Sequence, residues 1–118
     1  MKYKTIRELF SDRSRWTKNS IAKDKNGKSV HADEGEAVSF CLLGAVYHVY
    51  GYSDRGHGWG SSSKSHEVIS KINRKLVKSF PKRIYSLVRG DAINLHFFND
   101  NDITKFEEIL EVVRAARV

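Results

Sequence analysis

The sequence predicts a mainly α-helical domain built around a buried central helix at about residues 34–50. Apolar side chains cover almost the whole circumference of that segment, as expected of a helix enclosed on every side. Residues 64–80 carry an apolar stripe at helical spacing, with lysine and arginine on the opposite side. Residues 104–107, "TKFE", fit a capping box before a terminal helix. Because 118 residues support one core, we expect a single globular domain over 1–118.

The N-terminal part of the chain predicts a short helix followed by a hairpin. Apolar residues recur at helical spacing up to Phe10, and Trp16 is the expected anchor of this segment to the core. A short exposed β-hairpin or a plain loop is expected at about residues 19–32. "KNGK" at 25–28 contains the Asn-Gly pair that suits a type I′ turn, but its flanks hold few apolar residues.

Three further segments follow the central helix. Gly51 ends that helix, and a glycine- and serine-rich connection occupies residues 51–63. Pro81 ends the third helix, after which "RIYSLV" at 83–88 indicates another short helix. Residues 92–98, "AINLHFF", fit either a strand or a buried turn.

Composition indicates a cytoplasmic protein. No apolar run approaches the roughly 20 residues that cross a bilayer, and the N-terminus lacks a secretory h-region. The single cysteine cannot form an internal disulfide, which suits a reducing compartment. We therefore expect no membrane association.

The net charge of +7 is concentrated in one segment. Residues 64–89 contain eight lysines and arginines and one acid, Glu67, so the other residues sum to zero. Such a local excess favours an anionic partner, namely a nucleotide, a nucleic acid or an acidic protein surface. The third helix supplies the expected contacts: Lys64, Lys71, Arg74, Lys75 and Lys78. The alternative is a solvated face that maintains solubility, and no helix-turn-helix, RNA-recognition or zinc-finger pattern accompanies the charge.

The connection before that helix is a second candidate binding segment. Arg55, His57 and Trp59 supply a cation, a titratable ring and a stacking surface that suit a nucleotide or a base. The stretch is not a P-loop, because Lys64 follows three serines and no apolar strand precedes it. The alternative is a solvated loop with Trp59 folded back onto the core.

Cys41 has both a structural and a catalytic interpretation. In the catalytic hypothesis Cys41 is a nucleophile, His96 is its base, and Asn99 or Asp100 orients the imidazole. Cys41 is expected in the middle of the central helix, away from the helix N-terminus that activates many thiols. The burial tendency of cysteine, and Gly44 as a site of close approach by another helix, favour the structural interpretation. Asn99 and Asp100 equally suit a helix-capping turn.

The sequence suggests neither a metal nor a cofactor. The five histidines and one cysteine show no pattern of metal-ligand spacing. We expect no metal site and no cofactor.

Three motifs resemble those of a family of small bacterial and phage proteins known only as a domain of unknown function. These motifs are Trp16, "FCLLGA" at 40–45, and "FND" at 98–100 before a capped helix. In that family the third motif begins with tryptophan and precedes an arginine, whereas this chain has Phe98 and Ile103. The resemblance covers nearly the whole chain and implies no reaction.

The leading functional hypothesis is a small intracellular, non-enzymatic binding protein that engages an anionic partner. Its contacts would come from the basic helix at 64–83 and the 51–63 loop. The phage members of the similar family suggest host interaction or anti-defence, including capture of a nucleotide signal. The competing hypothesis is a small hydrolase or transferase that uses Cys41.

Overall fold

The mainly α prediction is confirmed. The computed structural model describes residues 3–53, 60–61, 63–88 and 91–118. Within them lie the helices α1 (Ile6–Leu9), α2 (Leu42–Tyr50), α3 (Ser63–Ser79), α4 (Asp91–Asp100) and α5 (Phe106–Ala116). Short 3₁₀ turns, η1 and η2, occupy Arg13–Arg15 and Pro81–Arg83.

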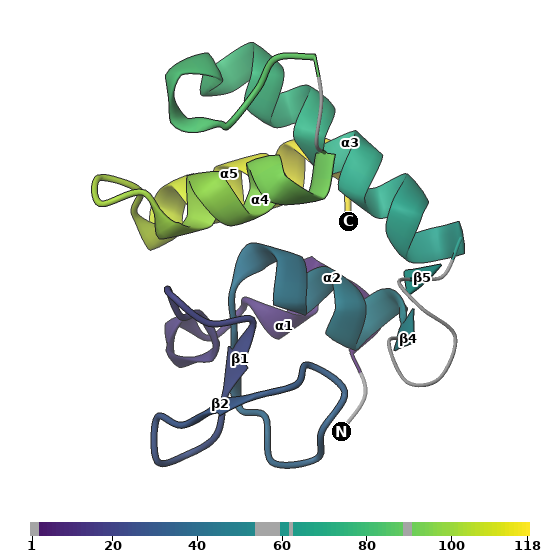
Figure 1. Cartoon of the computed structure of the whole chain (residues 1–118), viewed down its shortest axis with the longest axis vertical. Helices are drawn as coiled ribbons and strands as arrows, with labels where there is room; N and C mark the ends of the chain where they lie inside the picture. The colour runs from purple at the N-terminus through teal and green to yellow at the C-terminus, as the bar shows by residue number, and fades with distance from the viewer. Residues whose placement is uncertain (1–2, 54–59, 62, 89–90) are drawn as a thin grey trace.

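Helix α3 packs against α2, α4 and α5. In Figure 1, α3 and α4 occupy the upper half of the molecule, and α1, α2 and a small sheet occupy the lower half. Every α-helix contributes fully buried apolar side chains to the core. The largest of these side chains are Ile6, Leu9, Leu42, Val46, Val68, Ile72, Leu76, Leu95, Phe98 and Ile109.

The expected hairpin is present, with a different turn. Strands β1 (Ala22–Lys23) and β2 (Ser29–Val30) pair antiparallel, in the register Ala22 to Val30. Residues 24–28 form the connection, in which the Asp24 carboxylate accepts the backbone N–H groups of Asn26 and Lys28. Gly27 adopts a φ of 80°, which glycine tolerates without strain. The carboxylate thus supports a wider turn than the two-residue type I′ turn expected from Asn-Gly.

The central helix begins at Leu42, so its expected start at residue 34 is wrong. The preceding segment joins the hairpin instead: β3 (Ser39–Phe40) pairs antiparallel with β1, giving the order β2-β1-β3. The Val38 N–H donates to the Lys23 carbonyl at 2.9 Å, and the Cys41 N–H donates to the Ile21 carbonyl at 3.1 Å. These sheet bonds use backbone groups that a longer helix would need, which is why the apolar pattern overstates its length.

Residues 92–98 form neither a strand nor a buried turn, because they lie within α4. The short helix expected at 83–88 is also absent. After η2 the chain is irregular there, and the backbone N–H groups of Tyr85 and Ser86 donate to the side chain of Asn94. That side-chain acceptor replaces the carbonyls that a helix would supply.

The capping box of the last helix lies one residue later than expected. Lys105, not Thr104, is the N-cap, and its N–H donates to the Glu108 carboxylate at 2.9 Å. Thr104 is buried, and its hydroxyl oxygen has no hydrogen-bond partner among the described residues. No described helix is both long and apolar enough to cross a membrane.

Candidate functional site

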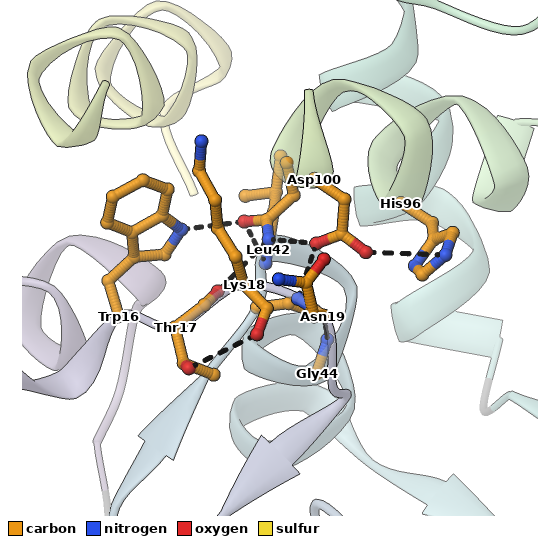
Figure 2. Close-up of polar contacts among 10 residues, drawn as sticks. Trp16, Thr17, Lys18, Asn19, Leu42, Gly44, His96 and Asp100 are labelled. Atoms are coloured by element: carbon orange, nitrogen blue, oxygen red, sulfur yellow. Dashed lines mark hydrogen bonds and ion pairs between the residues drawn. The ribbon is translucent and has the colours of Figure 1, made fainter. Parts of the chain in front are cut away.

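The buried amide of Asn99, near the end of α4, joins three distant segments (Figure 2). Its Oδ1 accepts the indole N–H of Trp16 at 2.6 Å and the backbone N–H of Leu42 at 3.0 Å. Its Nδ2 donates to the Thr17 carbonyl and to Oδ1 of Asp100, both at 3.0 Å. Two donors and two acceptor positions are the full capacity of an amide, so Asn99 is saturated.

Asp100 extends this network toward the surface. Its Oδ1 also accepts the backbone N–H of Asn19 at 2.9 Å, and its Oδ2 lies 3.5 Å from Nε2 of His96. Asn19 has a φ of 67°, in the left-handed region that asparagine tolerates better than most residues. Figure 2 shows His96 beside Asp100 at the edge of the cluster. The structure thus brings together His96, Asn99 and Asp100, as the catalytic hypothesis requires.

Cys41 is the N-cap of α2, so its expected position in the middle of a helix is wrong. Its Sγ accepts the backbone N–H of Gly44 at 3.3 Å. That bond and the helix N-terminus favour a thiolate, but Cys41 is 0% exposed. Burial dominates and raises the pKa of the Cys41 thiol to about 11, and the nearby negative charge of Asp100 adds to the rise. The sulfur is therefore a neutral thiol near neutral pH.

The described hydrogen bonds do not join Cys41 to His96. The imidazole is about half exposed on α4, whereas the sulfur is enclosed in the core. A general base must come within hydrogen-bond reach of its nucleophile. The arrangement consequently lacks the activated thiol that a cysteine hydrolase needs.

Gly44 is a site of close approach, but its neighbour is not another helix. A Cβ added at Gly44 would lie 2.0 Å from the carbonyl oxygen of Ile21. The same carbonyl accepts the N–H of Cys41. The segment that leads into β1 therefore lies directly against the first turn of α2, where only glycine leaves it room.

The cations of α3 form a basic stripe, defined here as Lys64, Lys71, Arg74, Lys75 and Lys78. They recur at spacings of three, four and seven residues, so they share one side of the helix over about 21 Å. Glu67 lies within this row and neutralises part of it, with its carboxylate 3.8 Å from Lys64 and 3.3 Å from Lys71.

Among the described residues, the C-terminal half of the basic stripe has no acidic neighbour. Across the described residues, no carboxylate lies within ion-pairing distance of Arg74, Lys75 or Lys78. Arg74 and Lys78 are exposed, and Lys75 is partly exposed. These three cations are available to an external anion.

The other candidate binding residues, Arg55, His57 and Trp59, lie outside the described residues. Their flanks are described: β4 (Tyr52–Ser53) pairs with β5 (Gly60–Ser61), so residues 53 and 60 lie opposite one another. β5 also contacts α3, whose Lys64 places its ammonium 5.9 Å from the ring centroid of Tyr50. The two ends of the connection therefore lie near the first turn of α3, which carries Lys64 of the basic stripe.

A large concavity on the opposite part of the chain does not suit an anion. It encloses about 930 Å³ between the hairpin and residues 31–36, and its lining includes Asp24, Glu34 and Glu36. Among the residues with described positions, no three histidine, cysteine or carboxylate side chains come close enough to hold a metal ion.

Sequence reasoning missed a second buried amide, Asn94, one and a half turns before Asn99 on α4. Its four hydrogen bonds join Tyr85, Ser86 and Asn73. Asn94 within the largely apolar stretch 92–98 was the available signal, since a buried amide requires partners.

A family model matches residues 3–118, and its description is a family of unknown function, DUF6197. The chain belongs to that family. No curated protein matches the chain, and no solved structure does. The motifs through which the sequence resembles a family all meet at Asn99, because Trp16, Leu42 and Asp100 are its direct partners. Membership in DUF6197 itself supplies no reaction.

Proposed function

We propose that the chain is a non-enzymatic binding protein of the cytoplasm that engages an anionic partner through the basic stripe. The observation that carries the proposal is the row Arg74, Lys75 and Lys78, which has no acidic neighbour among the described residues. Like charges on one helix repel one another at i,i+3 and i,i+4 spacing, so the row costs stability that an anion would restore.

The partner is a nucleotide, a nucleic acid or an acidic protein surface. If a phage encodes the chain, the binding would take place in the host cytoplasm and serve host interaction or anti-defence. The segment 54–59, with Arg55, His57 and Trp59, would add contacts beside Lys64, since its flanks lie next to the start of α3.

The competing hypothesis of a cysteine hydrolase or transferase has weaker support. The observation in its favour is the distance of 3.5 Å between Nε2 of His96 and Oδ2 of Asp100. Against it stand the complete burial of Cys41 and the raised pKa of its thiol. An enzyme of this class needs a thiolate that substrate can reach.

Charge reversal on the basic stripe tests the proposal. Fluorescence anisotropy would measure binding of two labelled probes, a single-stranded oligonucleotide and a glutamate-rich peptide. The expected result is that wild type binds at least one probe and that Lys75→Glu with Lys78→Glu weakens binding about tenfold or more.

The matched control is Lys25→Glu with Lys28→Glu. Both lysines are exposed in the turn of the hairpin, and this variant has the same change in net charge. It should bind like wild type. If both variants weakened probe binding equally, the effect would depend on net charge alone. Failure of wild type to bind either probe would refute the proposal.

A further inference from the structure

Five apolar side chains are exposed together where the chain passes from η2 to α4. We define them as the apolar patch: Tyr85, Leu87, Val88, Ile93 and Phe97. Val88 is 87% exposed, Leu87 61% and Phe97 46%. The ring centroids of Tyr85 and Phe97 are 5.7 Å apart, which joins the irregular segment to the face of α4. Clustered exposure of this kind marks an interaction site far more often than single exposed residues do.

The apolar patch is held in place by the buried side chain of Asn94. Its Oδ1 accepts the N–H groups of Tyr85 and Ser86 at 2.9 and 3.0 Å. Its Nδ2 donates to the Ser86 carbonyl at 2.7 Å and to Oδ1 of Asn73 at 2.8 Å. Asn73 in turn donates to Asp91 at 2.9 Å, so the segment is fixed to both α3 and α4. A fixed surface loses little entropy on binding, which favours recognition.

One exposed cation, Lys82, lies close to the apolar patch along the chain, and Lys78 precedes it at the end of α3. In Figure 1 the chain after α3 passes over the top of the molecule. Lys82 precedes Tyr85 by three residues, within about 11 Å along the chain, and Lys78 lies in the last turn of α3. Both lysines are exposed, and neither has an ion-pair partner in the described part of the chain. Arg83 differs, because Glu108 neutralises it at 2.7 Å.

We propose that the apolar patch, Lys82 and the C-terminal half of the basic stripe together bind an acidic amphipathic segment of a partner protein. This inference rests on the proposed function and specifies its anion. Leucine or aromatic side chains of the partner would cover Leu87, Val88 and Phe97, and its carboxylates would pair with Lys78 and Lys82. The apolar contact supplies affinity, and the charges select an acidic partner.

Two other occupants, a second copy of the chain and a nucleic acid, fit this surface less well. A contact between two copies would bring together two chains that each carry a net charge of +7, and their mutual repulsion opposes dimerisation. A nucleic acid could stack on Tyr85 or Phe97, but bases gain little from aliphatic Leu87, Val88 and Ile93. An amphipathic peptide complements both halves of the surface.

The test uses three labelled probes and the full-length protein. One is a helical peptide with leucine and phenylalanine on one face and glutamate on the other. The second carries serine in place of every apolar residue, and the third is a single-stranded oligonucleotide. Wild type should bind the amphipathic peptide about tenfold or more tightly than the serine peptide. Equal binding of the two peptides, or binding of the oligonucleotide alone, would overturn the inference.

Leu87→Ser with Val88→Ser is the variant for the apolar patch, because both side chains are largely exposed and fold stability should change little. It should reduce binding of the amphipathic peptide about tenfold while leaving binding of the serine peptide unchanged. Ile103→Ser is the matched control, since Ile103 is 62% exposed but follows the opposite end of α4. Wild-type affinity in the patch variant would overturn the inference.

The two proposals can fail separately. Loss of peptide binding in Lys75→Glu with Lys78→Glu, but not in the patch variant, would retain the basic stripe and overturn the apolar contact. Binding that depends on the apolar patch alone would overturn both the charge pairing proposed here and the function proposed above. A dimer that dissociates in the patch variant would assign the patch to a second copy and overturn the inference.

Discussion

The indole N–H of Trp16 donates to Oδ1 of Asn99 at 2.6 Å, across 83 residues of sequence. The same oxygen accepts the backbone N–H of Leu42, so it also serves the first turn of α2. One amide thereby fixes the relative positions of the N-terminal segment, the central helix and α4. This arrangement explains the motifs "FND" and "FCLLGA" by their hydrogen bonds in the fold, without a catalytic role.

Asn99→Ala should destabilise the fold by about 2–4 kcal/mol, because it leaves buried donors and a buried carbonyl without partners. Trp16→Phe, which removes one donor and keeps an aromatic ring, should cost less. Urea unfolding followed by circular dichroism measures both. A midpoint for Asn99→Ala equal to that of wild type would show that the amide does not join these segments.

Gly44→Ala should lower the free energy of unfolding by about 2 kcal/mol or more. The new methyl group would overlap the Ile21 carbonyl, and the gain of about 1 kcal/mol in helix propensity does not offset that overlap. The control is Gly35→Ala, since a Cβ there meets nothing within 4 Å. Thermal unfolding should separate the two variants, and equal melting temperatures would contradict the close approach.

The Cys41 thiol should react with iodoacetamide far more slowly in the native protein than in urea. Its pKa of about 11 leaves on the order of one thiolate in a thousand at about pH 8, and burial blocks the reagent as well. His96→Ala should not change the rate. Rapid native alkylation that His96→Ala abolishes would instead support the enzyme hypothesis.

Alkaline pH should destabilise wild type through Cys41. The folded-state pKa of about 11 lies above the ordinary value of 9.0, so the unfolded chain releases its proton first. Stability is therefore nearly full below about pH 9 and falls by about 2 kcal/mol as pH rises to 11. Burial also raises the pKa values of Tyr47 and Tyr50, so the difference between wild type and Cys41→Ala isolates the thiol. Parallel pH profiles of the two proteins would contradict this prediction.

Local patterns predicted the helices α1, α3 and α5 and the hairpin, because their apolar spacing and turn residues act within a few positions. The start of α2 could not be predicted in this way. Residues 38–41 follow the helical pattern, but Val38 and Cys41 donate to carbonyls of residues 21–23. Pairing with a distant strand outweighed local propensity.

The same distinction applies to the candidate site: features set within one helix were predictable, and contacts between distant segments were not. The helical spacing of Lys71, Arg74, Lys75 and Lys78 predicted a shared face, since it depends on one helix alone. The partners of Asn94 and Asn99 were not predictable, because each amide joins segments far apart in sequence. The burial of Cys41 was expected from the tendency of cysteine, whereas its position at the N-cap depended on where α2 begins.

The salt dependence of binding tests the central claim most directly. For a single-stranded oligonucleotide or another flexible polyanion held by four cations of the basic stripe, the slope of log affinity against log salt should be about −3. The slope should fall to about −1.4 in Lys75→Glu with Lys78→Glu, and it should stay near −3 in Lys25→Glu with Lys28→Glu. A flat slope for wild type, or equal slopes in all three proteins, would contradict binding through α3.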